Sequence, residues 1–250
     1  MSGFVVVIPA RFASVRLPGK PLREIAGKPM LQHVHERAID SAAGEVIVAT
    51  DDPRIAGAAK RFGAEVCLTS ADHRSGTERL AEVARIRGWP AARVVVNLQG
   101  DEPLMPPQLI DQCAALLEAG DADMATLASP LESLEEFRNP NVVKVLVDAR
   151  GEAIYFSRAA IPYPRSEGNA GQAMRCALRH HGIYAYRADA LQQFVRAAPS
   201  PLEECEHLEQ LRALTIGFRI RVGQPRVRPG PGVDTEEDLQ RVAALLGKPP

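Results

Sequence analysis

Three cations and a serine follow the first apolar run of the sequence. The stretch VVVIPARFASVRLPGKPL, residues 5–22, carries Arg11, Ser14, Arg16 and Lys20 in its loop and contains no acidic residue. Guanidinium forks, an ammonium group and backbone N–H groups at the end of a strand can surround a polyanion such as a triphosphate. The loop is not a Walker A loop, because Ser14 occupies the place of its first glycine, and no GxGxxG follows the strand. A solvated loop whose cations face water is the alternative.

Two other loops carry aspartates that are suited to bind a divalent cation. NLQGDEPLMPP, residues 97–107, contains Asp101 and Glu102, and GPGVDTEEDL, residues 230–239, contains Asp234. An acid at the end of a buried strand is costly unless it is paired or binds a cation. Two aspartates that converge on one hard cation from separate loops are typical of phosphoryl or nucleotidyl transfer. For Asp234, a helix cap is the alternative.

A hydroxyl-rich segment, DHRSGTERL at residues 72–80, precedes a helical pattern. Ser75, Gly76 and Thr77 offer hydroxyl and amide groups to a small ligand, and Arg79 follows in the first turn. A capped helix start, with Ser75 or Thr77 as the cap, explains the same residues and is the favoured interpretation of this segment taken alone.

Polar residues in the second half of the chain could contact an acidic polyol. RHHGIYAYR contains His180 and His181, which lack the i, i+4 spacing of a metal pair and have no cysteine nearby to complete a ligand set. We interpret them as hydrogen-bonding groups. Glu209 and Gln210 in EHLEQLR could reach sugar hydroxyls, although an exposed helix face is the alternative, and Arg158 in YFSRA could bind a carboxylate.

Composition excludes several classes of protein. The 250 residues are 46% apolar, enough for a full core, and 30 basic against 31 acidic residues argue against a protein that coats nucleic acid or anionic membrane. The four cysteines form no CxxC pair, so neither a zinc site nor a disulfide framework is indicated. No apolar run approaches the roughly 18 residues of a membrane span, and the first strand begins at once. We therefore expect a cytoplasmic protein.

Short β-branched runs alternate with helical patterns along the first part of the chain. Apolar strands separated by helices indicate a sheet covered on both faces, which predicts a doubly wound, mostly parallel α/β fold. Residues 124–187 are strand-like with little helix, so we expect an antiparallel extension there, within one domain spanning residues 1–250. Residues 162–172 read as a turn-rich loop, and helices are predicted over residues 201–214 and 235–246. The predicted strands are residues 4–8, 45–50, 65–68, 93–98, 142–148 and 218–222.

Eight motifs taken together resemble the 3-deoxy-manno-octulosonate (Kdo) cytidylyltransferase family, the CMP-Kdo synthetases. They are IPARFASVRLPGKPL, RSGTERLAEV, NLQGDEPLMPP, NPNVVKVL, YFSRAAIP, HGIYAYR, PSPLEECEHLEQLR and GVDTEEDL, in order over residues 5–239. The resemblance implies an α/β fold of nucleotide-sugar-transferase type and a homodimer that requires Mg²⁺. It also implies coupling of CTP to Kdo with release of pyrophosphate, before the sugar enters lipopolysaccharide.

The resemblance also implies a role for each matched position and a mechanism. The anomeric hydroxyl of Kdo attacks the α-phosphorus of CTP without a covalent enzyme intermediate, while cations neutralise the phosphate charge. The implied positions are Lys20, Arg11 and Arg16 as catalytic cations, Ser14, Ser75, Gly76, Arg79 and Gln99 as CTP contacts, Arg158, His180, Tyr184, Glu209 and Gln210 as Kdo contacts, and Asp101 and Asp234 as Mg²⁺ ligands.

Three rival functions follow from the same residues. The first is another nucleotidylyltransferase of this fold, such as a CMP-sialate synthetase or a uridylyltransferase acting on a sugar phosphate; the latter would need a second basic cluster, which the sequence lacks. The second is a catalytically silent nucleotide-binding module, against which Asp101 and Asp234 argue. The third, a nicotinamide dehydrogenase, lacks its glycine fingerprint.

Overall fold

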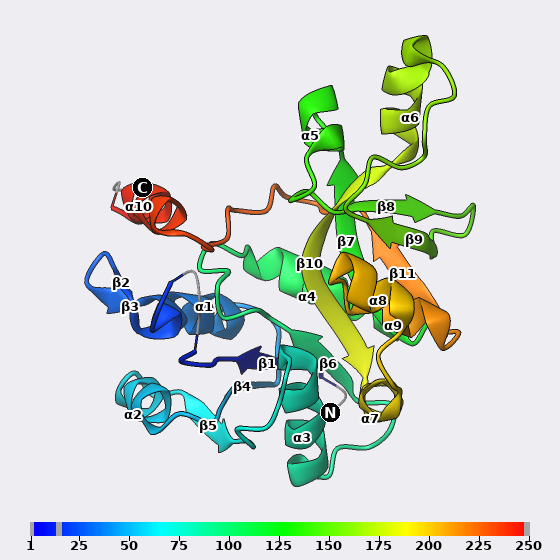
Figure 1. The fold of residues 1–250 in the computed structure, drawn as a ribbon. Coiled ribbons are helices and arrows are strands. Elements are labelled where there is room, and N and C mark those ends of the chain that lie inside the picture. The colour runs from blue at the N-terminus through cyan, green and yellow to red at the C-terminus, as the bar shows by residue number, and fades with distance from the viewer. Residues whose placement is uncertain (1–2, 14–16, 248–250) are drawn as a thin grey trace.

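Strands from the whole length of the chain build one large sheet (Figure 1). The structure is a computed structural model, and it describes residues 3–13 and 17–247. The predicted strands at residues 45–50 and 65–68 are confirmed to the residue, and the others lie within two residues of their expected ends. The strands are β1 Val5–Pro9, β2 Glu24–Ile25, β3 Lys28–Pro29, β4 Glu45–Thr50, β5 Glu65–Leu68, β6 Val94–Asn97, β7 Met124–Pro130, β8 Lys144–Val147, β9 Ala153–Ser157, β10 Leu178–Arg187 and β11 Ile220–Gly223.

The helices are short. Even the longest two, α3 Gly76–Arg87 and α4 Pro107–Glu118, have 12 residues each. Among the described residues, none has the length and apolarity that a membrane crossing requires. The described residues also form two short 3₁₀ helices, Lys20–Leu22 and Glu167–Asn169. The helices are α1 Met30–Ile39, α2 Pro53–Arg61, α3 Gly76–Arg87, α4 Pro107–Glu118, α5 Leu134–Arg138, α6 Ala170–Cys176, α7 Ala188–Arg196, α8 Pro201–Glu206, α9 Gln210–Thr215 and α10 Glu236–Leu246.

The sheet is mostly parallel, with antiparallel additions where the sequence predicts them. Within the described residues, its main path runs β11-β7-β10-β6-β1-β4-β5. The pairs β6–β1, β1–β4, β4–β5 and β11–β7 are parallel, whereas β10 is antiparallel to both β6 and β7. Strands β8 and β9 extend the sheet from β10 as a further antiparallel pair. Because β1 and β6 are parallel neighbours, the loops that follow them leave from the same edge of the sheet.

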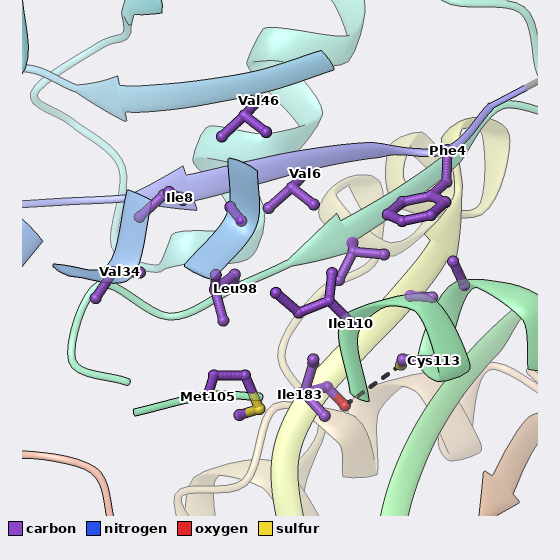
Figure 2. Packing of buried hydrophobic residues seen from close by; sticks show 14 of the residues in the cluster. Phe4, Val6, Ile8, Val34, Val46, Leu98, Met105, Ile110, Cys113 and Ile183 are labelled. Atoms are coloured by element: carbon purple, nitrogen blue, oxygen red, sulfur yellow. Dashed lines mark hydrogen bonds between the residues drawn. The ribbon is translucent and has the colours of Figure 1, made fainter. Parts of the chain in front are cut away.

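Helices cover both faces of the sheet, as a doubly wound fold requires. All five residues of β1 are buried, so its alternate side chains enter two different cores. On one face, Val6 and Ile8 pack with Val34 of α1 and Ile110 of α4 (Figure 2). On the other face, the alternate valines of β1 join apolar residues of α3, α7 and α9. The predicted fold class is confirmed.

The last helix, α10, docks on the β2–β3 hairpin and the start of α1 (Figure 1). Its apolar residues Leu239 and Val242 pack with Ile25 and Met30 in a small third core. A capping box starts the helix, because Thr235 and Asp238 exchange side-chain and backbone hydrogen bonds, so the cap is Thr235 and not Asp234. The residue just before this cap, Asp234, is therefore held at a fixed place.

Two predicted segments differ from the structure. The expected helix over residues 201–214 is two helices, α8 and α9, because His207 has a left-handed backbone with φ of 51° and ends the first one. The turn-rich loop at residues 162–172 gives way to α6 from Ala170 onward. Helix α6 packs against Phe137 of α5 in a small separate core, and both helices project beyond one end of the sheet (Figure 1).

Candidate active site

A cavity of about 490 Å³ opens where β1 and β6 end. Its walls come from five separate segments: the loop after β1, the start of α3, the loop after β6, the start of α9 and the residues before α10. The structure thus brings together most of the residues that the sequence predicts for the nucleotide side of the site. The predicted residues that line the cavity are Arg11, Lys20, Ser75, Gly76, Arg79, Gln99, Asp101, Glu209 and Asp234.

Lys20 lies between the two predicted metal aspartates. Its Nζ is 2.7 Å from Asp101 Oδ2 and 3.1 Å from Asp234 Oδ1. The lysine side chain is only 12% exposed, whereas those of Asp101 and Asp234 are 36% and 52% exposed. Two carboxylates from loops far apart in the sequence therefore converge on one cationic centre.

Glycines allow these loops to approach each other. A Cβ atom at Gly100 would lie 2.9 Å from the carbonyl oxygen of Pro9, which no side chain tolerates. A Cβ atom at Gly232 would lie 2.9 Å from Glu102 Oε1. The backbone N–H of Val233 donates to the Asp101 carbonyl at 2.9 Å, which ties the two aspartate loops together. The glycine-rich sequence around Asp234 therefore permits its close approach to Asp101.

A third carboxyl group lies behind the aspartates. Burial raises the pKa of Glu102 to about 8, with further contributions from the charges of Asp101 and Asp234, while Lys20 opposes the shift. Glu102 is therefore mostly protonated at neutral pH. The sequence places Glu102 beside Asp101 but does not indicate its burial, which depends on the glycine turn that covers it.

The donor set fits Mg²⁺. Within residues 3–13 and 17–247, no group of three or more His, Cys, Asp or Glu side chains is arranged to hold a metal on its own. Mg²⁺ is usually held by one or two carboxylates, with water and substrate phosphates in its other positions. The convergence of Asp101 and Asp234 meets that need, whereas no soft ligand lies with them in the cavity wall.

The start of α3 forms another wall of the cavity. Ser75 Oγ accepts a hydrogen bond from the Glu78 backbone N–H at 3.3 Å, so the predicted helix cap is confirmed. Thr77 Oγ1 donates to Glu209 Oε2 at 2.7 Å. This bond joins the nucleotide side of the site to α9, 132 residues further along the chain.

Arg79 connects the start of α3 to the segment that precedes it. Its side chain is buried, and Nη1 donates to Thr69 Oγ1 at 2.7 Å and to the Ser70 carbonyl at 3.1 Å. Its Nη2 pairs with Asp51 Oδ1 at 2.6 Å, without the angle of a hydrogen bond. Much of the guanidinium is therefore occupied by protein groups, and direct contact between Arg79 and CTP stays a prediction.

A group of polar side chains from β7 and β10, which we call the β7–β10 band, adjoins this wall. It consists of the buried Thr126, Tyr184 and Tyr186 and the half-buried His180. The Tyr184 ring centroid is 5.2 Å from that of His180 and 5.9 Å from that of Tyr186. Tyr186 lies beside Thr77 and Asn97; their hydrogen bonds lower its pKa, but burial raises it more.

Two buried polar atoms beside the band have no partner. Among the described residues, Tyr184 Oη and Asn97 Oδ1 are buried and make no hydrogen bond. Tyr184 lies opposite Asn97 in the β10–β6 pairing, and burial raises its pKa well above the ordinary value. Because buried polar groups are almost always satisfied in proteins, a neutral phenol without a partner indicates a place where a ligand group belongs.

The band histidine is neutral at ordinary pH. Burial lowers the pKa of His180 to about 3, and the neighbouring His181 lowers it further. Burial likewise lowers the pKa of His181 to about 4, with Arg179 acting in the same direction and Glu136 opposing it. Both rings therefore act as neutral hydrogen-bonding groups, and the expectation that they are not metal ligands stays a prediction.

The remaining predicted Kdo contacts lie on or near α8 and α9. Glu209 is the N-cap of α9 and lines the cavity, while Gln210 is buried in the first turn and does not line it. Arg158 also lies outside the cavity wall. Its Nε donates to the Glu206 carbonyl at 2.7 Å, and its Nη1 donates to the Pro140 carbonyl at 3.2 Å. Contact between Arg158 and a carboxylate of the substrate stays a prediction.

The sequence analysis does not predict every residue of the site. His73 and Arg74 line the cavity, Tyr186 belongs to the β7–β10 band, and Asn97 lies beside Tyr186. The sequence does hold a signal for the last two. Asn97 ends the valine run of β6, and Tyr184 and Tyr186 stand two apart in β10, so each strand presents polar groups on one face. The predicted phosphate-loop residues that lie outside the described part of the chain are Ser14 and Arg16.

Known proteins match the chain along nearly its whole length. A sequence profile described as cytidylyltransferase matches residues 5–220. The 3-deoxy-manno-octulosonate cytidylyltransferase of Yersinia enterocolitica serotype O:8 / biotype 1B is 56% identical over 248 residues, which cover 97% of this chain and 98% of that protein. The protein of that name from Serratia proteamaculans is 55% identical over 244 residues, covering 96% and 97%. The chain belongs to the 3-deoxy-manno-octulosonate cytidylyltransferase family.

Solved structures agree with this family and with its fold. A CMP:2-keto-3-deoxy-manno-octonic acid synthetase complexed with CTP superposes with a TM-score of 0.90 at 46% identity, covering 98% of both chains. A cytidylyltransferase from Leptospira borgpetersenii has a TM-score of 0.62 at 18% identity, covering 98% of this chain and 86% of the other, and so supports the fold alone. The resemblance to the 3-deoxy-manno-octulosonate cytidylyltransferase family that the eight motifs carry is confirmed.

Proposed function

We propose that the protein transfers CMP from CTP to Kdo and releases pyrophosphate. The observation that carries the proposal is the convergence of Lys20, Asp101 and Asp234 in a cavity that is also lined by the start of α3. The family membership supports both substrates. By the same resemblance, the protein acts as a cytoplasmic homodimer that supplies activated Kdo for lipopolysaccharide synthesis.

The reaction is an in-line displacement at the α-phosphorus of CTP. The anomeric oxygen of Kdo forms a bond to this phosphorus, the bond from phosphorus to the oxygen shared with the β-phosphate breaks, and the hydroxyl proton passes to solvent. Lys20 and Arg11 neutralise negative charge on the phosphates, and Ser75 and Gly76 bind the nucleoside. Catalysis therefore rests on positioning and on preorganised charge.

Asp101 and Asp234 would hold Mg²⁺ beside Lys20. The bound ion would supply Lewis-acid stabilisation of the phosphate charge. The protein contributes two carboxylates that are fixed by the Val233 backbone hydrogen bond and by the α10 cap, so their positions need little adjustment when the substrate binds.

The acceptor side suits a sugar that offers many hydroxyl groups. Glu209 presents a carboxylate in the cavity wall. Tyr184 and His180 present neutral hydrogen-bonding groups in the β7–β10 band, which adjoins that wall where Tyr186 lies beside Thr77. A sugar phosphate would require a second basic cluster, whereas Arg158 uses two of its guanidinium nitrogens on backbone carbonyls. These features favour a free acidic sugar over a sugar phosphate.

A pyrophosphate-release assay tests the proposal. We expect activity with CTP and Kdo in the presence of Mg²⁺, and much less with UTP, ATP or GTP, with N-acetylneuraminate, or after chelation of the metal. Activity with UTP and a sugar phosphate but none with Kdo would contradict it. Absence of any turnover, together with tight CTP binding, would favour the silent nucleotide-binding module.

A further inference from the structure

Thr126 of β7 contacts two groups of β10 at once. Its side chain is completely buried. Its Oγ1 lies 3.0 Å from His180 Nε2 and 2.6 Å from the carbonyl oxygen of Ile183. The pairing of β7 with β10 shifts register between His180 and Tyr184, and this irregularity turns both groups toward the same threonine.

The threonine has one proton to donate, and its position follows from the shorter contact. Two oxygens 2.6 Å apart need a hydrogen between them, and the Ile183 carbonyl is only an acceptor. The hydroxyl proton is therefore directed at Ile183, which leaves a lone pair of Oγ1 facing His180 Nε2. For a favourable contact, Nε2 must carry the hydrogen. The backbone N–H of Gly182 also points at Nε2, at 3.3 Å, and is compatible only with an Nε2 that carries no hydrogen. The two contacts therefore compete, and we assign the hydrogen by the shorter one, to Thr126 Oγ1 at 3.0 Å.

The other ring nitrogen of His180 is then a bare acceptor. Nδ1 makes no hydrogen bond to any described residue, and it is not among the buried polar atoms that lack a partner, so solvent or a ligand can reach it. The ring is held on two sides, because its centroid lies 5.2 Å from those of Phe156 and Tyr184. Burial keeps the pKa of His180 near 3, so the ring is neutral when the enzyme works.

We propose that Thr126 is a positioning residue that fixes His180 as its Nε2–H tautomer, so that Nδ1 accepts a hydrogen bond from a hydroxyl group of the acceptor sugar. An Nδ1 without a hydrogen repels a carboxylate, so His180 selects the polyol part of the sugar and leaves its carboxylate to cationic groups. The role of Nδ1 toward the sugar rests on the proposed function, whereas the tautomer does not.

The tautomer is measured without any substrate. In ¹⁵N-histidine-labelled protein at pH 7, we expect the ring nitrogens of His180 to give the signals of a protonated Nε2 and an unprotonated Nδ1. Thr126→Ser keeps the hydroxyl and should keep this pattern, whereas Thr126→Val should convert it to a mixture of tautomers. A wild-type His180 with its hydrogen on Nδ1 would overturn the proposal, and this result does not depend on whether the valine variant folds.

Steady-state kinetics test the consequence for the sugar. Thr126→Val should raise the KM for Kdo about tenfold, the usual cost of one misdirected hydrogen bond, with the KM for CTP unchanged. Thr126→Ser should restore the wild-type value. The matched control is Ser129→Ala, which removes the hydroxyl 2.9 Å from Nε2 of the neighbouring His181 and should change neither constant.

The possible failures are distinguishable. An unchanged KM for Kdo in a folded Thr126→Val variant, or equal losses for Kdo and CTP, would overturn the positioning role. If the wild-type protein shows the Nε2–H tautomer but never uses Kdo, the proposed function fails and the role of Nδ1 toward this sugar fails with it.

Discussion

The cavity at the strand ends and the β7–β10 band hold their polar groups in different ways. In the cavity, Lys20, Asp101 and Asp234 carry formal charges, and the two aspartates are 36% and 52% exposed. In the band, Tyr184 is only 7% exposed and His180 stays neutral, because burial opposes their ionised forms. Under the proposed function, one side recognises charge on the nucleotide, whereas the other recognises the directions of hydrogen bonds on the sugar.

The two regions should therefore respond differently to substitution. Removal of a charge in the cavity leaves its partners unneutralised and should reduce the rate of the chemical step. Removal of one hydrogen-bonding atom in the band should mainly weaken binding of the acceptor. Four predictions test this contrast.

Lys20→Ala should give the largest loss. Without its ammonium, Asp101 and Asp234 lose the cation that both of them contact, and the loss of one preorganised electrostatic contact costs roughly 10² to 10³ in turnover. Rates of pyrophosphate release at saturating CTP and Kdo check this. Lys28→Ala is the control, because Lys28 is 46% exposed and pairs only with Glu36 among the described residues. Wild-type turnover in the Lys20 variant would refute its assigned role.

Asp234→Asn should change the metal requirement. One of the two charged ligands is lost, so the Mg²⁺ concentration for half-maximal rate should rise on the order of 10- to 100-fold, while the KM for Kdo changes little. Titration of the rate with Mg²⁺ measures this shift. Asp40→Asn, on the surface at the end of α1, is the matched control. A Mg²⁺ dependence identical to that of the wild type would exclude Asp234 as a ligand.

The pKa of His180 in the β7–β10 band should make the protein less stable in acid. The pKa of Glu102, behind the cavity aspartates, should make it less stable in base. The folded His180 has a pKa of about 3, below its ordinary 6.5, so the unfolded chain binds a proton first and stability falls as pH drops below 6.5. Glu102, with a folded pKa of about 8 against 4.5, stabilises most fully below pH 4.5, and this contribution is lost as pH rises through 8.

Urea unfolding in metal-free buffer measures both effects. Between pH 7 and 4.5, His180→Gln should remove about 2 kcal/mol of the acid dependence. Glu102→Gln should instead flatten the decline between pH 5 and 8. If each substitution leaves the slope of its own pH range unchanged, the buried neutral states assigned to these two groups are wrong.

Tyr184→Phe should separate stability from binding. Because the phenol oxygen has no partner among the described residues, its removal should leave the free energy of unfolding unchanged or raise it by about 1 kcal/mol. The KM for Kdo should nevertheless rise about tenfold, as expected for one lost hydrogen bond. Thermal unfolding and steady-state kinetics provide the two values. A destabilised variant with normal Kdo kinetics would show that the hydroxyl serves the fold.

The cavity was far easier to predict from the sequence than the band. Charged residues that directly follow apolar strands must meet at one edge of a parallel sheet, so the convergence of Lys20 and Asp101 follows from the pattern. Asp234 joins them because a glycine-rich turn precedes a recognisable helix cap. For the sugar contacts, the pattern marks Arg158, His180, Glu209 and Gln210 only as polar candidates, and the resemblance to a family adds Tyr184 and assigns all of them to Kdo.

The contacts within the β7–β10 band and the bounds of three helices depend on geometry that the local sequence does not encode. The isolation of Tyr184 Oη and the contact of Thr126 with His180 depend on the register of β10 and on its irregularity between residues 180 and 184. The break between α8 and α9 depends on the left-handed backbone of His207, although the apolar periodicity continues across it. Helix α6 has only seven residues and packs against Phe137 in a small separate core.

An isotope experiment tests most directly whether the anomeric oxygen of Kdo attacks the α-phosphorus of CTP. Kdo that carries ¹⁸O at its anomeric hydroxyl is incubated with CTP, Mg²⁺ and enzyme, and the products are read by ³¹P NMR. We predict that the label appears in the oxygen that joins the sugar to phosphorus in CMP-Kdo, with none in pyrophosphate. Unlabelled CMP-Kdo, label in pyrophosphate, or no CMP-Kdo at all would contradict attack of the sugar on the α-phosphorus.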